Sequence, residues 1–172
     1  FVDPGTRQIL LPDPKGPGPH EVDRRSIYIR HRRTQPLTFL QVFDQAAPEP
    51  NCVARSTSTV VAQSLAMLNS DFAVTAARDL AGLLYQQAPG SKDARLALAI
   101  ERTWCRTATA QELADAAAFV EERAAKLRDS ARVAAELPLP TSVAADADPH
   151  EAAALTLFCL TLVNSNEFLY VD

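Results

Sequence analysis

The sequence lacks most of the patterns that mark catalytic, nucleotide-binding or membrane-spanning segments. No apolar run reaches the ~18 residues that a membrane-spanning helix needs, so no membrane span is expected. No glycine-rich phosphate loop, G-x-S-x-G elbow or H-E-x-x-H pattern occurs. Glycine is scarce, with 5 among 172 residues, whereas alanine is abundant, which favours helix. These absences exclude the commonest signatures of nucleotide binding, serine hydrolysis and zinc proteolysis.

Cysteine and histidine offer no recognisable metal or cofactor site. The three cysteines are far apart and no C-x-x-C pair is present, which excludes a zinc ribbon, a thioredoxin motif and c-type haem attachment: Cys52, Cys105 and Cys159. We expect three buried or half-buried thiols, with one disulfide plus a free thiol as the alternative. The histidines stand in polar surroundings without a partner at helical spacing: His20, His31 and His150. We therefore expect no cofactor, no metal and no catalytic residue.

The charge of the chain is close to balanced. The net charge is -4, which gives no global field for nucleic acid. A local basic stretch, residues 24–33, surrounds Ile27, Tyr28 and Ile29 with arginines and could contact phosphates. Alternatively, these arginines pair with some of the 21 acidic residues of the chain. We expect this structural role and no nucleic-acid partner.

The N-terminal residues differ in composition from the rest. Residues 1–23 hold five prolines and three glycines, which predicts an extended arm, or else a disordered linker. Residues 24–172 are expected to form one helical domain. Because the chain begins at Phe1 and not at Met, we expect it to be a piece of a longer protein.

The remaining pattern predicts an all-α fold, an irregular bundle of about five helices. A short helical turn from Pro36 to Asp44 is expected to come first. The first long helix should run from about Ser58 to Leu68, with three apolar residues inward: Val61, Leu65 and Leu68. The second should begin after Asn69, with Ser70 or Asp71 as its cap, and end before Pro89. Its apolar stripe at helical spacing is Phe72, Ala76, Leu80, Leu83 and Leu84.

The later helices have clearer starts. The third should open at Ser91 and bury Leu96, Ile100 and Trp104. Thr109 and Glu112 form a capping box for the fourth, which should reach about Glu136. The fifth should begin at Asp148-Pro149, with Glu151 as a further capping residue and four inward residues: Leu155, Phe158, Cys159 and Leu162. The aromatic ending, Phe168 to Tyr170, is expected to be irregular or extended and buried against the core.

Several motifs in order resemble a known family. They are R-R-S-I-Y-I (24–29), V-F-D (42–44), N-C-V-A-R-S (51–56), Q-S-L-A-M-L-N (63–69), R-L-A-L-A-I-E-R and T-A-T-A-Q-E-L within 95–113, and N-S-N-E-F-L-Y-V-D (164–172). Residues 24–172 are thus similar to the C-terminal domain of unknown function fifteen fifty-three of planctomycete cytochrome-c and PSD-type multidomain proteins. The resemblance implies a large exported protein, hence a periplasmic or secreted location, and supplies no catalytic residues.

Two interpretations of function follow. In the first, the chain is a non-catalytic structural or interaction module that packs against upstream domains of the same protein or a partner chain. In the second, it is part of an enzyme, for example a polysaccharide-degrading one, whose active site is completed by residues outside this chain. The polar residues to suspect in that case are Asp44, Arg55, Gln63 and Asn69.

Overall fold

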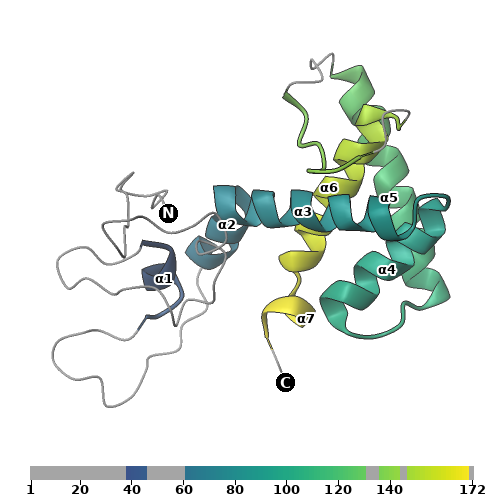
Figure 1. Ribbon diagram of the computed structural model, residues 1–172. Helices are drawn as coiled ribbons and strands as arrows, with labels where there is room; N and C mark the ends of the chain where they lie inside the picture. Colours follow the sequence, from purple (N-terminus) through teal and green to yellow (C-terminus); the bar gives the residue numbers. More distant parts are fainter. Residues whose placement is uncertain (1–37, 46–60, 131–135, 144–146, 171–172) are drawn as a thin grey trace, which may run out of the picture. The chain divides into compact units, whose positions relative to one another are not determined.

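The computed structural model describes residues 38–45, 61–130, 136–143 and 147–170. These residues form seven α-helices and no strand, so the predicted all-α class is confirmed (Figure 1). The predicted arm (1–23), the basic stretch (24–33), Cys52 and Arg55 lie outside the described residues. The chain divides into two compact units, one up to Met67 and one from Leu68. No helix within the described ranges is both long and apolar enough to cross a membrane.

The first unit contains α1 (Thr38–Val42) and most of α2 (Val61–Asn69). The inward face predicted for α2 is wrong, because Val61 is 77% exposed, Leu65 52% and Leu68 46%. The buried residues of α2 are Gln63 and Met67. Gln63 is buried because its amide Nε2 donates to the carbonyl oxygen of Val42 at 3.0 Å. This satisfied hydrogen bond removes the penalty of burying a polar group, which the spacing of apolar residues could not reveal.

The second unit is built around α6 (Pro149–Val163). This helix contacts α3 (Asp71–Gln87), α4 (Lys92–Trp104), α5 (Ala110–Asp129) and α7 (Asn166–Leu169), most extensively α5 and α3. Figure 1 shows α3 crossing α6. A helix enclosed in this way must be apolar on almost every side, and the buried residues of α6 are Ala152, Ala153, Ala154, Leu155, Thr156, Phe158, Cys159, Leu162 and Val163. The four inward residues predicted for this helix are therefore confirmed.

The face of α3 that meets the core is made of small residues. Ala73, Ala77 and Ala81 are buried with Leu84, whereas Phe72 is 53% exposed and Ala76 is exposed. The predicted stripe is thus wrong at its N-terminal half and displaced by one position. Ala77 and Ala81 belong to the same core cluster as Leu155, Phe158, Cys159 and Leu162 of α6, so small side chains on α3 meet larger ones on α6. Side-chain size at the contact, and not hydrophobicity alone, sets which face is buried.

The helix starts follow the predicted caps. Ser70 and Ser91 cap α3 and α4, and Thr109 with Glu112 forms the capping box of α5. Asp148 caps α6 by accepting from the His150 N–H at 2.8 Å, with Pro149 in the first turn. Two expectations are corrected. The helix α5 ends at Asp129, where Ser130 is the C-cap, and not near Glu136; Glu151 pairs with Lys92 and is not a capping residue.

The thiols differ from one another. Cys159 is fully buried in α6, and burial raises its pKa to about 12. Cys105 is exposed, contrary to the expectation of buried or half-buried thiols, and ends α4 with a left-handed φ of 55°. Both are free thiols. An exposed cysteine is compatible with the C-cap, because the residue after a helix commonly adopts this conformation.

A loop is fastened to the outer side of α3. The Arg78 Nε donates to the Leu139 carbonyl at 2.6 Å, and the Thr141 N–H donates to the Arg78 carbonyl at 3.2 Å. Gly82 gives the loop room, since a Cβ there would lie 2.8 Å from the Thr141 Oγ1 and 3.0 Å from the Ser142 N. The glycine inside α3 is therefore a packing residue.

We expect Gly82→Ala to destabilise the protein. Overpacking costs ~1–3 kcal/mol, and the ~1 kcal/mol that alanine contributes in a helix interior offsets only part of this. The midpoint of urea unfolding measures the net loss, expected near ~1 kcal/mol. Gly90→Ala is the matched control, because its Cβ would meet nothing within 4 Å. Equal stability of Gly82→Ala and wild type would contradict the close approach.

The C-terminal segment forms the helical turn α7 and is not irregular or extended as predicted. It is held by polar contacts: the Trp104 Nε1 donates to the Ser165 Oγ at 2.8 Å, and the Arg106 Nε donates to the Glu167 Oε1 at 2.6 Å. Phe168 and Tyr170 are 43% and 48% exposed. Arginine and tryptophan therefore fix this end, and the aromatic side chains that were expected to do so do not.

This arrangement predicts a small effect for Phe168→Ala. Truncating a half-exposed side chain should change the free energy of unfolding by less than ~1 kcal/mol. Leu162→Ala, on the same end of the core and 3% exposed, should cost ~2–5 kcal/mol. Thermal or urea unfolding of the two variants makes the comparison. A loss at Phe168 as large as that at Leu162 would mean that the aromatic ending is buried after all.

Candidate functional site

The structure describes three of the four polar residues suspected from the sequence: Asp44, Gln63 and Asn69. Asp44 follows α1 with a positive φ of 54°, and Gln63 reaches the main chain of Val42, two residues earlier. Gln63 and Asp44 thus belong to the same end of α1 in the first unit. Asn69 is the exposed last residue of α2, in the second unit. Arg55 lies outside the described residues, so its place in a site stays a prediction.

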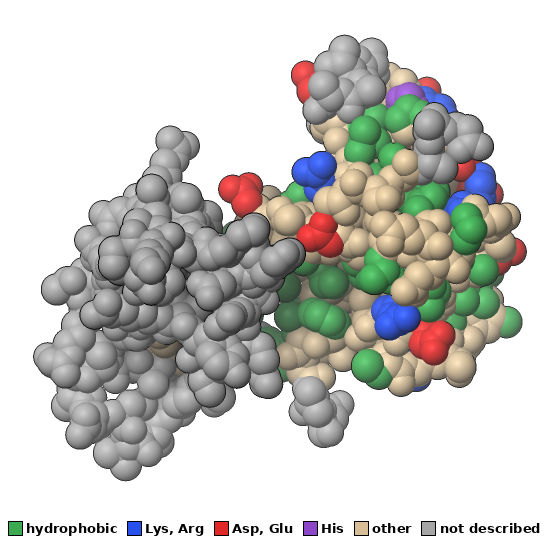
Figure 2. Space-filling view, viewed as in Figure 1, with side chains coloured by type: hydrophobic (Ala, Val, Ile, Leu, Met, Phe, Trp, Pro, Cys, Tyr) green, Lys and Arg blue, Asp and Glu red, His purple; other side chains and the backbone are tan. Residues whose placement is uncertain are grey.

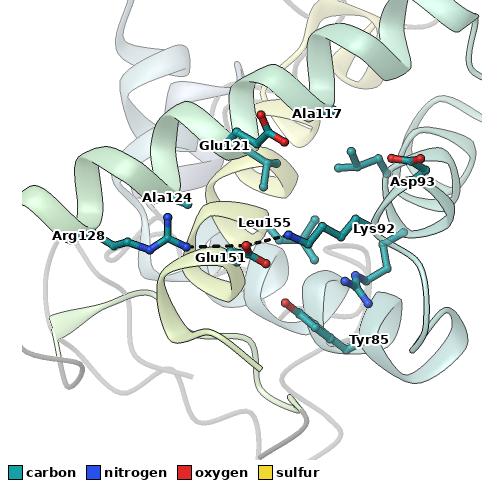
Figure 3. Close-up of a pocket in the computed structure, with 12 residues that line it drawn as sticks. Tyr85, Lys92, Asp93, Ala117, Glu121, Ala124, Arg128, Glu151 and Leu155 are labelled. Atoms are coloured by element: carbon teal, nitrogen blue, oxygen red, sulfur yellow. Dashed lines mark hydrogen bonds and ion pairs between the residues drawn. The ribbon is translucent and has the colours of Figure 1, made fainter. Parts of the chain in front are cut away.

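A pocket in the second unit offers a better-defined candidate. Its volume is about 210 Å³, and four helices contribute to its wall (Figure 3). The floor is apolar and comes from α4, α5 and α6: Leu96, Ala117, Val120, Ala124 and Leu155. The rim is charged and aromatic: Tyr85, Lys92, Asp93, Arg95, Glu121, Arg128 and Glu151. An apolar floor with a few polar groups at the rim is the usual composition of a small-molecule site.

A chain of ion pairs crosses this pocket. The Lys92 Nζ lies 2.7 Å from the Glu151 Oε1, and the Arg128 Nη2 lies 3.7 Å from the same oxygen (Figure 3). Arg128 also pairs with Asp148, the cap of α6. The pKa of Asp148 is lowered to about 2, chiefly because Arg128 donates a hydrogen bond to its carboxylate. The three helices α4, α5 and α6 are therefore linked by charge at this end of the unit.

Arg95 and Tyr85 form the opposite wall. The Arg95 Nη1 donates to the carbonyl oxygens of Ala88 at 3.1 Å and Pro89 at 3.0 Å, which closes the turn between α3 and α4. Its guanidinium stacks over the Tyr85 ring, 4.6 Å from the centroid. Burial is the main cause that raises the pKa of Tyr85. The phenol therefore stays protonated at neutral pH and acts as a neutral hydrogen-bonding group.

Two carboxylates at the rim are not part of this network. Asp93 in the first turn of α4 and Glu121 on α5 line the pocket. Neither has an ion pair with another residue in the portion of the chain that the structure describes. Figure 3 shows both on one side of the Lys92–Glu151–Arg128 line and Tyr85 on the other. Among the described residues, the rim thus carries two carboxylates outside the ion-pair network.

His150 stands next to the network. Its Nδ1 lies 3.3 Å from the Asp148 Oδ1, an arrangement that can orient an imidazole for proton transfer. Asp148, however, also caps α6 and binds Arg128. Within the described ranges, no three metal-ligating side chains come together. The contact between His150 and Asp148 is therefore part of the N-terminal cap of α6.

A second charged cluster, which we call the Arg106 clasp, joins Arg106, Glu112 and Glu167. The Arg106 guanidinium donates to Glu112 at 2.6 and 3.0 Å and to Glu167 at 2.6 and 3.1 Å. Its carbon atom Cζ also lies 5.0 Å from the Trp104 ring centroid. The pKa of Glu112 is lowered to about 2, chiefly because Arg106 donates hydrogen bonds to its carboxylate. The clasp connects the capping box of α5 to α7.

Sequence reasoning missed the pocket. Its residues come from four helices between Tyr85 and Leu155, so no spacing in the sequence connects them. The only available signal was charge in the first turns of α4 and α6, and Glu151 was interpreted there as a capping residue. Lys92 and Arg128 carry no such signal in the sequence, because isolated surface cations are common.

Residues 9–120 match the model of the family PSD1, described as "Protein of unknown function (DUF1553)". The chain belongs to this family. Comparisons with curated proteins and with solved structures found no match. The matched residues end within α5, so the DUF1553 match includes Tyr85 to Val120 of the pocket but not Glu121, Arg128 or Glu151.

The Arg106 clasp predicts an acid-sensitive contribution to stability. Glu112 has a pKa of about 2 in the folded protein against 4.5 as the reference value. Because the folded pKa is the lower one, the contribution is present above pH 4.5 and is lost as pH falls towards 2. Glu112→Gln keeps a capping side chain and should lower the urea midpoint at pH 7, with the difference from wild type shrinking in acid.

A double-variant cycle controls this experiment. In an Arg106→Gln background, Glu112→Gln should have a much smaller effect at neutral pH, since the charge partner is already gone. If the Glu112→Gln effect were the same at neutral and acidic pH, or unchanged without Arg106, the clasp would not be the source of the pH dependence.

Proposed function

We propose that this DUF1553 chain is a non-catalytic helical module that holds parts of a larger protein, or a partner chain, together. The observation that carries the proposal is how its charged groups are used. Glu151 joins Lys92 to Arg128, and Asp148 both caps α6 and binds Arg128. Groups of the type that transfers protons in enzymes are thus engaged in linking helices.

The surface also supports an interaction role. Val61 on α2 is 77% exposed and Leu68 46% exposed, although large apolar side chains cost free energy in water. On the face of the second unit shown in Figure 2, hydrophobic side chains reach the surface at several places, with Lys, Arg, Asp and Glu scattered between them. Such a mixed surface favours a protein partner over nucleic acid, which requires clustered positive charge.

The setting of the module is part of the same proposal. The motifs at 24–29 and 164–172 resemble planctomycete multidomain proteins that carry cytochrome c modules. We therefore place the chain outside the cytoplasm, periplasmic or secreted, with upstream domains of the same protein as the first candidates for its partner. The match to DUF1553 over residues 9–120 supports membership of the family, and the setting rests on the resemblance.

A second candidate function is a share in an active site that residues outside this chain complete. Asp44 is held in a left-handed conformation with φ 54°, which is uncommon for a residue other than glycine. Gln63 anchors the same end of α1. Backbone outliers gather at functional sites, so these two residues are the place to test for activity, for example on polysaccharides.

One experiment separates the two functions. The parent protein is produced in two pieces, this chain and the remainder, and their association is measured by analytical ultracentrifugation. We expect association, and we expect Val61→Glu or Leu68→Glu to weaken it about tenfold or more, since a charge would replace apolar contact area. Ala62→Glu, also exposed on α2 but about 100° around the helix from Val61, is the matched control.

The same pieces test the alternative. If the two pieces together hydrolyse a polysaccharide, and Asp44→Asn removes that activity while association persists, the enzymatic function is correct. Failure of the two pieces to associate at micromolar concentration would contradict the interaction module.

A further inference from the structure

The C-terminal turn α7 is held to the second unit mainly by side-chain hydrogen bonds, since none of its residues is buried. Two side chains at the end of α4 reach it. The Trp104 Nε1 donates to the Ser165 Oγ at 2.8 Å, and the Arg106 guanidinium donates to both carboxylate oxygens of Glu167, at 2.6 and 3.1 Å. A segment with few buried apolar contacts opens more readily than the core to which it is attached.

The helices next to α7 are closed by their own residues. Asn164 ends α6, because its N–H donates to the Thr161 carbonyl at 3.2 Å and its Nδ2 to the Leu160 carbonyl at 2.7 Å. The Cys105 N–H ends α4 by donating to the Glu101 carbonyl at 2.9 Å. None of these hydrogen bonds involves α7, so both helix ends keep them if α7 moves away.

Arg106 has a second partner that does not move with α7. Its guanidinium also donates to Glu112 at 2.6 and 3.0 Å, and Glu112 is tied to the start of α5 by accepting from the Thr109 N–H at 2.7 Å. Losing Glu167 therefore leaves Arg106 paired. The side chains of Arg106 and Glu167 are 38% and 43% exposed, so water can replace their contact at small cost.

We propose that α7 is a releasable latch, which detaches from α4 and α6 as a unit while the helices α3 to α6 stay folded. Rising ionic strength favours the detached state, because the pair of Arg106 and Glu167 is exposed and therefore screened by salt. Release frees residues 168–170, two aromatic side chains and a leucine, as a mobile apolar ending. This device is independent of the interaction role proposed above, whose residues lie on α2.

Native-state hydrogen exchange of the 15N-labelled chain tests the proposal. The amides of residues 168–170 donate to carbonyl oxygens of the same turn, so their exchange measures its opening. We expect them to be protected relative to an unstructured peptide and yet to exchange much faster than the Leu162 amide of α6. Their exchange should also be insensitive to urea below the unfolding transition, because a local opening exposes little surface.

The charge of the latch is tested by Glu167→Gln. This variant should speed exchange at residues 168–170 about two- to fivefold, the size of effect of one exposed ion pair, and leave Leu162 unchanged. Raising NaCl from about 0.05 M to about 0.5 M should act in the same way on the wild type but not on Glu167→Gln. Glu122→Gln is the matched control, because it removes another exposed carboxylate, which pairs with Lys126 within α5.

Trp104 gives a second readout, because it is the only tryptophan of the chain. Ser165→Ala removes the acceptor of its Nε1–H. We expect a shift in tryptophan emission together with faster exchange at residues 168–170. Unchanged emission and exchange would contradict the role of this hydrogen bond in holding α7.

Three exchange results would overturn the proposal. Residues 168–170 could exchange with the rate and the urea dependence of Leu162, in which case α7 opens only when the core unfolds. They could lack protection in the wild type, in which case α7 is not attached. Equal effects of Glu167→Gln and Glu122→Gln would mean that the overall charge, and not the contact with Arg106, controls the opening.

Discussion

Packing of α6 against its neighbours is the constraint on which the second unit depends. Ala152, Ala153 and Ala154 are fully buried, and the buried face of α3 is largely alanine. Further along, Phe158 meets Phe119 of α5 with ring centroids 6.0 Å apart. Small and large side chains thus both fill the space around α6. The positions of α3, α4 and α5 around α6, and with them the pocket, depend on this shared core.

Ion pairs connect the helices at the two ends of α6, outside the apolar core. At the start of α6, Lys92, Arg128, Asp148 and Glu151 tie three helices together. At its end, the Arg106 clasp ties α5 to α7. Exposed ion pairs contribute little individually, ~0–1 kcal/mol, so their role here is to set register and orientation, while burial around α6 supplies most of the stability.

Local signals in the sequence predicted local structure well. Thr109 with Glu112, Ser91 and Asp148-Pro149 identify helix starts because capping depends on residues within one turn. The prediction of the buried helix face was wrong where burial depends on a residue distant in the sequence. Gln63 is buried where it binds the main chain of Val42, and Ala77, not Ala76, belongs to the core cluster that includes residues of α6. Neither condition is encoded near the residue that it affects, and the pocket, assembled from four helices, was missed for the same reason.

The tail shows how the same limit applies to an aromatic motif. Phe168, Leu169 and Tyr170 predicted burial from hydrophobicity, yet the segment is anchored by Ser165 and Glu167, which bind Trp104 and Arg106. With the anchor polar, Phe168 and Tyr170 remain nearly half exposed. An aromatic side chain that the protein holds in place without burying it retains apolar area for another surface. The end of this DUF1553 chain thus combines a fixed backbone with accessible aromatic rings, which is consistent with a module that acts by contact.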